Sequence, residues 1–245
     1  MRHFKYQILF SAIILCSCGQ VNQNRNIQSA SVDKKHSDTL FINFDTLENK
    51  YNSIPVNFDT LYVLAKQLNV QADNYSNRKE LKLTDIYKRC ADIYRAQPFP
   101  GCDKFKTSNN PSKSELLCSK DTSLIMNCYK KAIEIFKSNS DTLSSSFADA
   151  IFQLSDVYEQ LGRFQLALPY RKQYLDIMLK TEKPVSEITG DAYMLLASNY
   201  ELQGDYITAY KFYLKELENR KVDNYRDLKN VEKRIMAFKN EHHFE

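Results

Sequence analysis

A segment of about 42 residues occurs twice in the second half of this chain, and that repetition limits the fold more than any other feature. Repeats of this length are typical of proteins that stack small helical units along one direction. With Tyr158 aligned on Tyr200, the neighbouring positions match in residue type: Ile151 with Tyr193, Leu154 with Leu196, Ser155 with Ala197, Gly162 with Gly204, Phe164 with Tyr206, Ala167 with Ala209 and Leu175 with Leu217.

Each copy has the apolar spacing of two helices separated by a glycine. Gly162 follows the first apolar stripe and is the residue type that most often ends a helix. We therefore expect an antiparallel helix pair, with small residues where the two helices come close. The first stripe is Ile151, Leu154, Tyr158 and Leu161, and the second is Phe164, Ala167, Leu168 and Leu175.

One such pair cannot bury its own apolar face, so further helices must complete the stack. Residues 129–135 match the second helix of an earlier copy, whose first helix, around 111–119, is degenerate. Near the C-terminus, Leu228, Val231, Ile235 and Phe238 form another stripe, as expected of a capping helix. The predicted fold class is all-α, an antiparallel helix-hairpin solenoid with a period near 42 residues that fills 114–245.

The preceding segment, 39–113, is predicted to be helical as well. Its expected helices are 59–68, with Asn57 as N-cap, and a second one that carries Leu83, Ile86, Cys90 and Tyr94. The pentapeptide that starts at Asn43 recurs at Asn57, and we interpret both copies as helix starts.

Composition narrows the chemistry of the folded part. The four histidines are all near the ends of the chain, at His3, His36, His242 and His243. The sequence therefore offers no histidine from its middle as a catalytic base or metal ligand, no Cys-x-x-Cys pair and no glycine-rich phosphate loop. The only catalytic pattern is Ser76-x-x-Lys79, which lacks its companion motifs, so we expect no enzyme and no cofactor.

The N-terminus is typical of a secretory signal, here residues 1–17, with Arg2 and Lys5 before a short apolar run. Removing these two from the 34 basic side chains leaves the rest nearly matched by the 30 acidic ones, which disfavours a nucleic-acid partner. The polar residues up to 38 are predicted to form a flexible tether.

Two resemblances refine this prediction. Leu15 to Cys18 resembles the bacterial lipobox, which implies lipidation of Cys18, and Gly19 in the next position implies the outer membrane, facing the periplasm of a Gram-negative bacterium. The two copies resemble the tetratricopeptide repeat. This chain departs from that family's pattern at three side chains: Arg171 stands where an aromatic residue is usual, and Tyr174 and Glu216 stand where a small residue is usual. The period is also longer than the usual one, and the closing prolines are absent. Pro169 predicts a late start or a kink in its helix.

In the tetratricopeptide family the first helices line a groove that binds peptides. By that resemblance the groove of this chain would be acidic with two apolar anchors, and would suit a segment with Lys or Arg and a bulky side chain. The groove residues implied are Asp149, Phe152, Asp156, Glu159, Asp191, Met194, Ser198 and Glu201.

Two questions stay open at the level of sequence. Cys90, Cys102, Cys118 and Cys128 form either a bridge from Cys102 or a set of buried free thiols. The expected function is that of a membrane-tethered adaptor that binds a protein or peptide in the envelope. The alternative is a small-ligand or glycan sensor that uses a tyrosine-rich surface.

Overall fold

The computed structural model describes residues 30–52, 58–75, 79–96, 122–182, 185–222 and 226–244. Throughout these ranges the regular elements are α-helices, which confirms the predicted all-α class. The chain divides into two compact units, Met1–Thr39 and Leu40–Glu245, and the repeats lie in the second.

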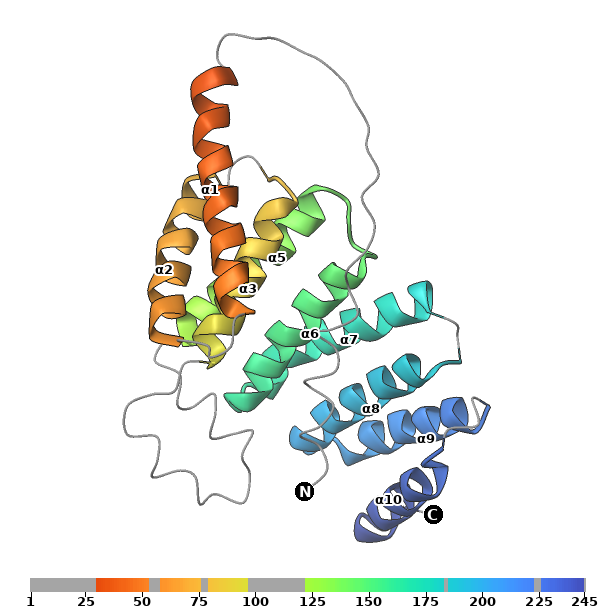
Figure 1. The fold of residues 1–245 in the computed structure, drawn as a ribbon. Helices are drawn as coiled ribbons and strands as arrows, with labels where there is room; N and C mark the ends of the chain where they lie inside the picture. The colour runs from red at the N-terminus through yellow and green to blue at the C-terminus, as the bar shows by residue number, and fades with distance from the viewer. Residues whose placement is uncertain are drawn as a thin grey trace. The chain divides into compact units, whose positions relative to one another are not determined.

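The helices of the described ranges follow one another in chain order (Figure 1). From α2 onward, each described helix packs against the next one along the chain. The bounds are α1 Ala30–Tyr51, α2 Phe58–Tyr75, α3 Lys82–Ala96, α5 Thr122–Ser138, α6 Ser145–Gln160, α7 Phe164–Thr181, α8 Glu187–Leu202, α9 Tyr206–Val222 and α10 Leu228–Glu241.

The predicted period of 42 residues is confirmed by where the helices begin. The second helices α5, α7 and α9 begin at Thr122, Phe164 and Tyr206, and the first helices α6 and α8 begin at Ser145 and Glu187. The helix pairs α6–α7 and α8–α9 are the two hairpins read from the sequence. Longer helices than those of a 34-residue repeat, together with the connection after Thr181, account for the extra length.

Helix α10 occupies the position of one further first helix and packs on α9, as expected of a capping helix. Its buried stripe is Val231, Ile235 and Phe238. The opposite side is polar apart from Met236, which suits the solvent-facing end of a helical stack.

The sequence placed the first helix of the pair that contains α5 around 111–119. Helix α5 packs most extensively on α3, which ends at Ala96, and the segment 111–119 lies outside the described residues. A long connection therefore separates the two helices of this pair, and it removes α3 from the 42-residue register. The 42-residue period by itself therefore does not identify α3 as the partner of α5.

Left-handed glycines end the first helices of both hairpins. Gly162 has φ of 69° and Gly204 has φ of 79°. The next amide in each copy, that of Arg163 or Asp205, donates back to the carbonyl of Tyr158 or Tyr200 at 2.8 and 3.0 Å. This is the hydrogen-bonded glycine turn that the sequence predicted, and it reverses the chain into the second helix.

Serine caps start the same two helices. Ser144 Oγ accepts from the amide of Phe147 at 3.2 Å, and Ser186 Oγ accepts from the amide of Thr189 at 3.1 Å. The caps are 42 residues apart and were not used in the alignment, so they support the repeat independently.

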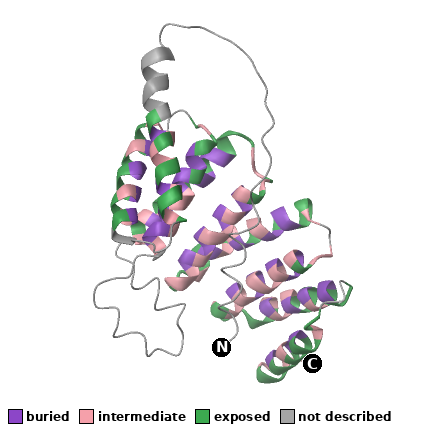
Figure 2. Ribbon diagram, viewed as in Figure 1, coloured by how far each residue is buried: buried purple, intermediate pink, exposed green. Residues whose placement is uncertain are grey.

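The buried residues form one apolar cluster that extends from α1 to α8 and a second that joins α8, α9 and α10 (Figure 2). Ser155, Ala167, Ala197 and Ala209 are fully buried. They lie where the sequence analysis placed the close contacts between paired helices.

Three local predictions need correction. The tether was expected to reach residue 38, whereas α1 begins at Ala30. Asn43 lies in the interior of α1 and starts no helix, while Asn57 is outside the described residues. Helix α2 continues past residue 68 to Tyr75.

Pro169 does not delay its helix. Helix α7 begins at Phe164, in register with α5 and α9, and contains Pro169 in its interior. The proline is exposed, while Ala167, Arg171 and Leu175 of the same helix are buried. Packing of those side chains fixes where α7 begins, and it outweighs the local preference of the proline.

The cysteine question is settled for two of the four residues. Cys90 and Cys128 are buried free thiols on the packed helices α3 and α5. Cys102 and Cys118 lie outside the described residues. Burial raises the pKa of the Cys128 thiol to about 12 and raises that of Cys90 well above its usual value.

The first prediction concerns the hairpin turn. Gly204→Ala should lower the free energy of unfolding by about 1–2 kcal/mol, because a left-handed backbone is strained for any residue with a Cβ. No atom lies within 4 Å of the Cβ that would be added, so the loss reflects backbone conformation and not a clash. Urea unfolding measures it. Ser140→Gly, at a position with φ of 57°, is the reciprocal control and should not destabilise the chain.

The second prediction concerns the two buried thiols. Because both stay protonated and inaccessible, iodoacetamide at pH 8 should leave Cys90 and Cys128 unmodified in the folded chain and modify both in urea. Peptide mass spectrometry identifies the alkylated positions. Fast alkylation of Cys128 in the folded chain would contradict its position in the core.

Candidate protein-binding face

The eight residues that the sequence proposed as a groove lie on two first helices. We refer to them as the first-helix face. Those on α6 come from one repeat and those on α8 from the next, at equivalent positions. The members are Asp149, Phe152, Asp156, Glu159, Asp191, Met194, Ser198 and Glu201.

The carboxylates of α6 are paired with basic side chains of neighbouring helices. Lys88 Nζ of α3 lies 2.7 Å from Asp149 Oδ2. Arg95, also on α3, pairs with Asp156 and donates to Gln153 at 2.8 Å. The members from α6 therefore connect one repeat to the one before it.

Glu159 has the strongest partner of the set. Arg171 of α7 donates to both carboxylate oxygens of Glu159, from Nε at 2.9 Å and from Nη2 at 2.6 Å. The side chain of Arg171 is only 2% exposed and that of Glu159 is 15% exposed. A two-bond guanidinium–carboxylate contact at this depth fixes the orientation of both groups.

The carboxylates of α8 are also engaged. Asp191 pairs with Arg220 of α9. Glu201 accepts a hydrogen bond from the hydroxyl of Tyr213, and Ser198 Oγ lies 3.2 Å from that same hydroxyl. Burial, and to a smaller extent the hydrogen bond to Glu201, raises the pKa of the Tyr213 hydroxyl to about 12.

These contacts correct the predicted electrostatics of the face. The sequence suggested an acidic surface for a partner rich in Lys or Arg. In the structure, Lys88, Arg95, Arg171 and Arg220 balance four of the five carboxylates. The prediction was wrong because these cations come from helices other than the two that carry the acids.

One position of the second helices forms a recurring polar contact with the first helices. Tyr129, Arg171 and Tyr213 are spaced by 42 residues. Each donates to a carboxylate of the first helix in its own pair: Tyr129 to Asp92 at 2.8 Å, Arg171 to Glu159, and Tyr213 to Glu201. Arg171, which departs from the tetratricopeptide pattern at this position, thus makes the same hydrogen bond with a guanidinium in place of a tyrosine hydroxyl.

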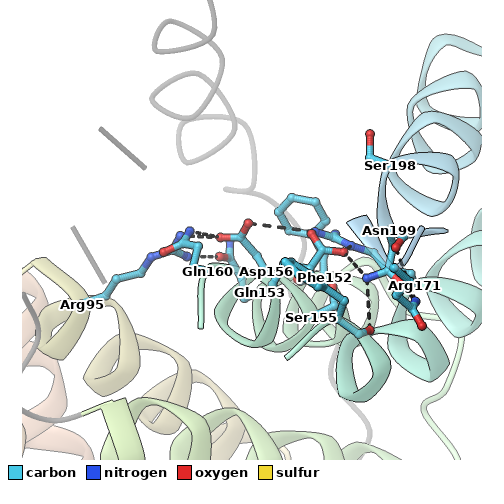
Figure 3. Close-up of polar contacts among 12 residues, drawn as sticks. Arg95, Phe152, Gln153, Ser155, Asp156, Gln160, Arg171, Ser198 and Asn199 are labelled. Atoms are coloured by element: carbon cyan, nitrogen blue, oxygen red, sulfur yellow. Dashed lines mark hydrogen bonds and ion pairs between the residues drawn. The ribbon is translucent and has the colours of Figure 1, made fainter. Parts of the chain in front are cut away.

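Asn199 extends this contact to the next repeat (Figure 3). Its Nδ2 donates to Glu159 Oε1 at 2.7 Å and to the carbonyl of Phe164 at 3.3 Å, so α8 is bonded to both helices of the preceding hairpin. Gln203 in turn donates to Asn199 Oδ1 at 2.7 Å.

A second buried charge cluster fastens the capping helix. Glu216 of α9 is fully buried and pairs with Arg220 at 3.0 Å and with Arg234 of α10. Gly190 of α8 lies opposite, where an added Cβ would be 3.3 Å from the side chain of Arg220. Glu216, where the tetratricopeptide pattern usually has a small residue, therefore supplies the carboxylate of this cluster.

The two apolar members of the face are partly buried. The ring of Phe152 packs against Tyr174 at 5.5 Å, and the guanidinium of Arg171 lies 5.0 Å from the same ring. Met194, its counterpart on α8, packs at the edge of the second apolar cluster. Tyr174, the third departure, thus supports Phe152.

The described ranges contain no cluster of acids, cysteines and histidines that could hold a metal ion, and none of their helices is long and apolar enough to span a bilayer. Of the tyrosines they include, Tyr206 is exposed and eight others are partly exposed, so the alternative of a tyrosine-rich ligand surface stays a prediction. Ser76 and Cys18, the predicted lipidation residue, lie outside them.

Comparison with known proteins finds partial likeness among solved structures. The sequence matches no protein-family model and none of the curated proteins. Among solved structures, BtubC (BKLC) from P. vanneervenii is 14% identical with a TM-score of 0.47, covering 86% of this chain and 84% of that one. The Podosopora anserina kinesin-light-chain-like protein with nearly identical TPR-like repeats is 14% identical with a TM-score of 0.40, covering 82% of this chain and 93% of that one.

The third prediction tests the charge balance of the face. Arg171→Ala should lower the free energy of unfolding by about 3 kcal/mol, because Glu159 keeps its charge at low exposure without its cation. Thermal or urea unfolding measures the change. Lys180→Ala is the matched control: its pair with Asp176 is more than half exposed, so the loss should stay below about 0.5 kcal/mol.

Proposed function

We propose that this chain is a non-enzymatic adaptor that holds a protein or peptide segment against the first-helix face. The observation that carries this proposal is the pairing of Phe152 with Met194. They occupy the same position in consecutive repeats and are the partly exposed apolar members of a face whose charges are otherwise engaged. Two apolar anchors on successive repeats suit an extended segment that crosses both.

The balanced charges define the kind of partner. Since Lys88, Arg95, Arg171 and Arg220 already neutralise carboxylates of the face, a strongly basic segment would have to displace internal ion pairs. The partner that fits is an uncharged segment with bulky apolar side chains. Binding of this type depends weakly on salt, because few charges are newly paired in the complex.

The proposed place of action is the bacterial envelope. It is supported by the lipobox-like residues up to Cys18 and by the secretory character of residues 1–17. A multiply acylated cysteine would hold the protein on a membrane durably, since a single chain binds only marginally. Gly19 supports the outer membrane as that location.

The fourth prediction is a binding test of the face. The full chain with Phe152→Ala and Met194→Ala should lose the partner that the wild-type chain crosslinks in solubilised envelopes. The chain with Lys180→Ala, on the exposed side of α7, should keep it. We expect wild-type recovery to change less than about threefold between roughly 0.05 and 0.5 M salt.

Two results would contradict the proposal. Equal recovery by the double variant would exclude these two side chains as anchors, provided that its unfolding curve is intact. A partner whose recovery falls steeply with salt would point to a charged surface elsewhere.

The proposed lipid anchor has its own test. Cys18→Ser should abolish metabolic labelling by palmitate and release the protein from membranes. Persistence of the label in this variant would contradict lipidation at Cys18.

A further inference from the structure

The Arg171 guanidinium has hydrogen-bonding capacity that the fold does not use. Its Nε and Nη2 are engaged by Glu159, and Nη2 also lies 3.9 Å from Asp156 Oδ1. Its Nη1 is buried and makes no hydrogen bond within the described part of the chain. A buried donor without an acceptor is unfavourable, so an acceptor that reached Nη1 would be stabilised there.

Arginine is not needed at this position to hold the hairpin together. The equivalent residues of the neighbouring repeats are Tyr129 and Tyr213, and each makes the same contact to a first-helix carboxylate through its hydroxyl. A tyrosine at 171 would leave no spare donor. Arg171 therefore adds a hydrogen-bond donor, Nη1, that the contact with Glu159 does not use.

Phe152, one of the two proposed apolar anchors, packs on the Arg171 guanidinium. The Arg171 guanidinium carbon lies 5.0 Å from the centroid of the Phe152 ring, and Phe152 is itself partly exposed, so a segment that docks on Phe152 comes close to this guanidinium. Figure 3 shows Phe152, Asp156 and Arg171 together on this face. A segment that displaced the ring would bring its own main chain to the guanidinium.

An unused acceptor lies on the other side of Asp156. Gln160 donates through Nε2 to Asp156 Oδ2 at 2.7 Å, while its Oε1 is buried and makes no hydrogen bond among the described residues. A spare donor and a spare acceptor that flank one carboxylate match the carbonyl and amide of a peptide backbone. They do not match a free anion, which could use only the donor.

The local charge favours the same occupant. Arg95 and Arg171 balance Asp156 and Glu159, so the cluster is neutral. A carboxylate placed at Nη1 would add an unbalanced negative charge at low exposure, whereas an amide carbonyl would not.

From these observations we infer that Arg171 is a recognition residue, whose Nη1 donates to a main-chain carbonyl of an uncharged extended segment once Phe152 has moved aside. This inference rests on the proposed function and adds the chemistry of the contact. The side chain that follows the carbonyl packs on Phe152 and Tyr174.

The test selects peptides from a random library displayed on phage, against the purified full chain in detergent. Selected peptides are synthesised and titrated against wild type, Arg171→Tyr and Lys180→Ala. Arg171→Tyr copies the sister repeats and keeps a hydrogen-bond donor for Glu159; urea unfolding verifies that it is folded under the conditions of the titration, and we expect it to bind about 10- to 100-fold more weakly. Lys180→Ala should bind like wild type.

A second readout separates recognition from structure. Replacing one peptide bond of the ligand by an ester weakens its carbonyl as an acceptor. Because the ester also lacks the amide N–H, we expect one such ester to weaken binding to wild type by a larger factor than it weakens binding to Arg171→Tyr. The side-chain resonances of arginine-labelled protein should show a new hydrogen bond at Arg171 on addition of the amide peptide.

The outcomes distinguish the two proposals. If Arg171→Tyr binds as tightly as wild type while Phe152→Ala with Met194→Ala does not bind, the role of Arg171 is wrong and the adaptor function stands. If the selected peptides are acidic and lose affinity with salt, the neutral-carbonyl inference is wrong. If no library peptide binds the full chain, both proposals are overturned.

Discussion

The contact between Arg171 and Glu159 is part of a polar network that spans three consecutive helix pairs. It joins the two helices of one hairpin, Asn199 of the next hairpin bonds to the same carboxylate, and Arg95 reaches the adjacent Asp156 from the pair before. Three consecutive units are thus registered by one polar network over an apolar core. Because apolar packing alone is tolerant of small slips, such a network defines how the helices align.

The network also determines what the surface can recognise. An acid that is already paired with a cation attracts a charged partner less, so four of the five acids of the first-helix face contribute mainly to architecture, two of them, Asp149 and Asp191, while 44% and 45% exposed. What remains for a partner is apolar area at Phe152 and Met194 and the unused hydrogen-bonding atoms beside Asp156. The same residues explain both the stability of the stack and the uncharged character of the segment proposed for it.

The sequence predicted the period and the turns because these depend on local preferences. Gly162 and Gly204 have the left-handed backbone that glycine favours, and Leu154 and Leu196, the equivalent leucines of the two stripes, are buried. It did not predict the partner of α5, because the long connection after Ala96 shifts α3 out of register. The ion pairs were missed for a related reason: Arg95 and Asp156 are 61 residues apart, and no periodicity reports a contact over that distance.

A double-mutant cycle on Arg171 and Glu159 tests the central claim most directly, that this contact fixes the register of the repeats. The variants are Arg171→Met, Glu159→Gln and the pair together, with unfolding free energies from urea titration. We predict a coupling energy of about 2 kcal/mol or more between the two positions, and a double variant more stable than the sum of the single losses implies. Additive losses, with a coupling near zero, would contradict it and would leave the stack to be held by its apolar core alone.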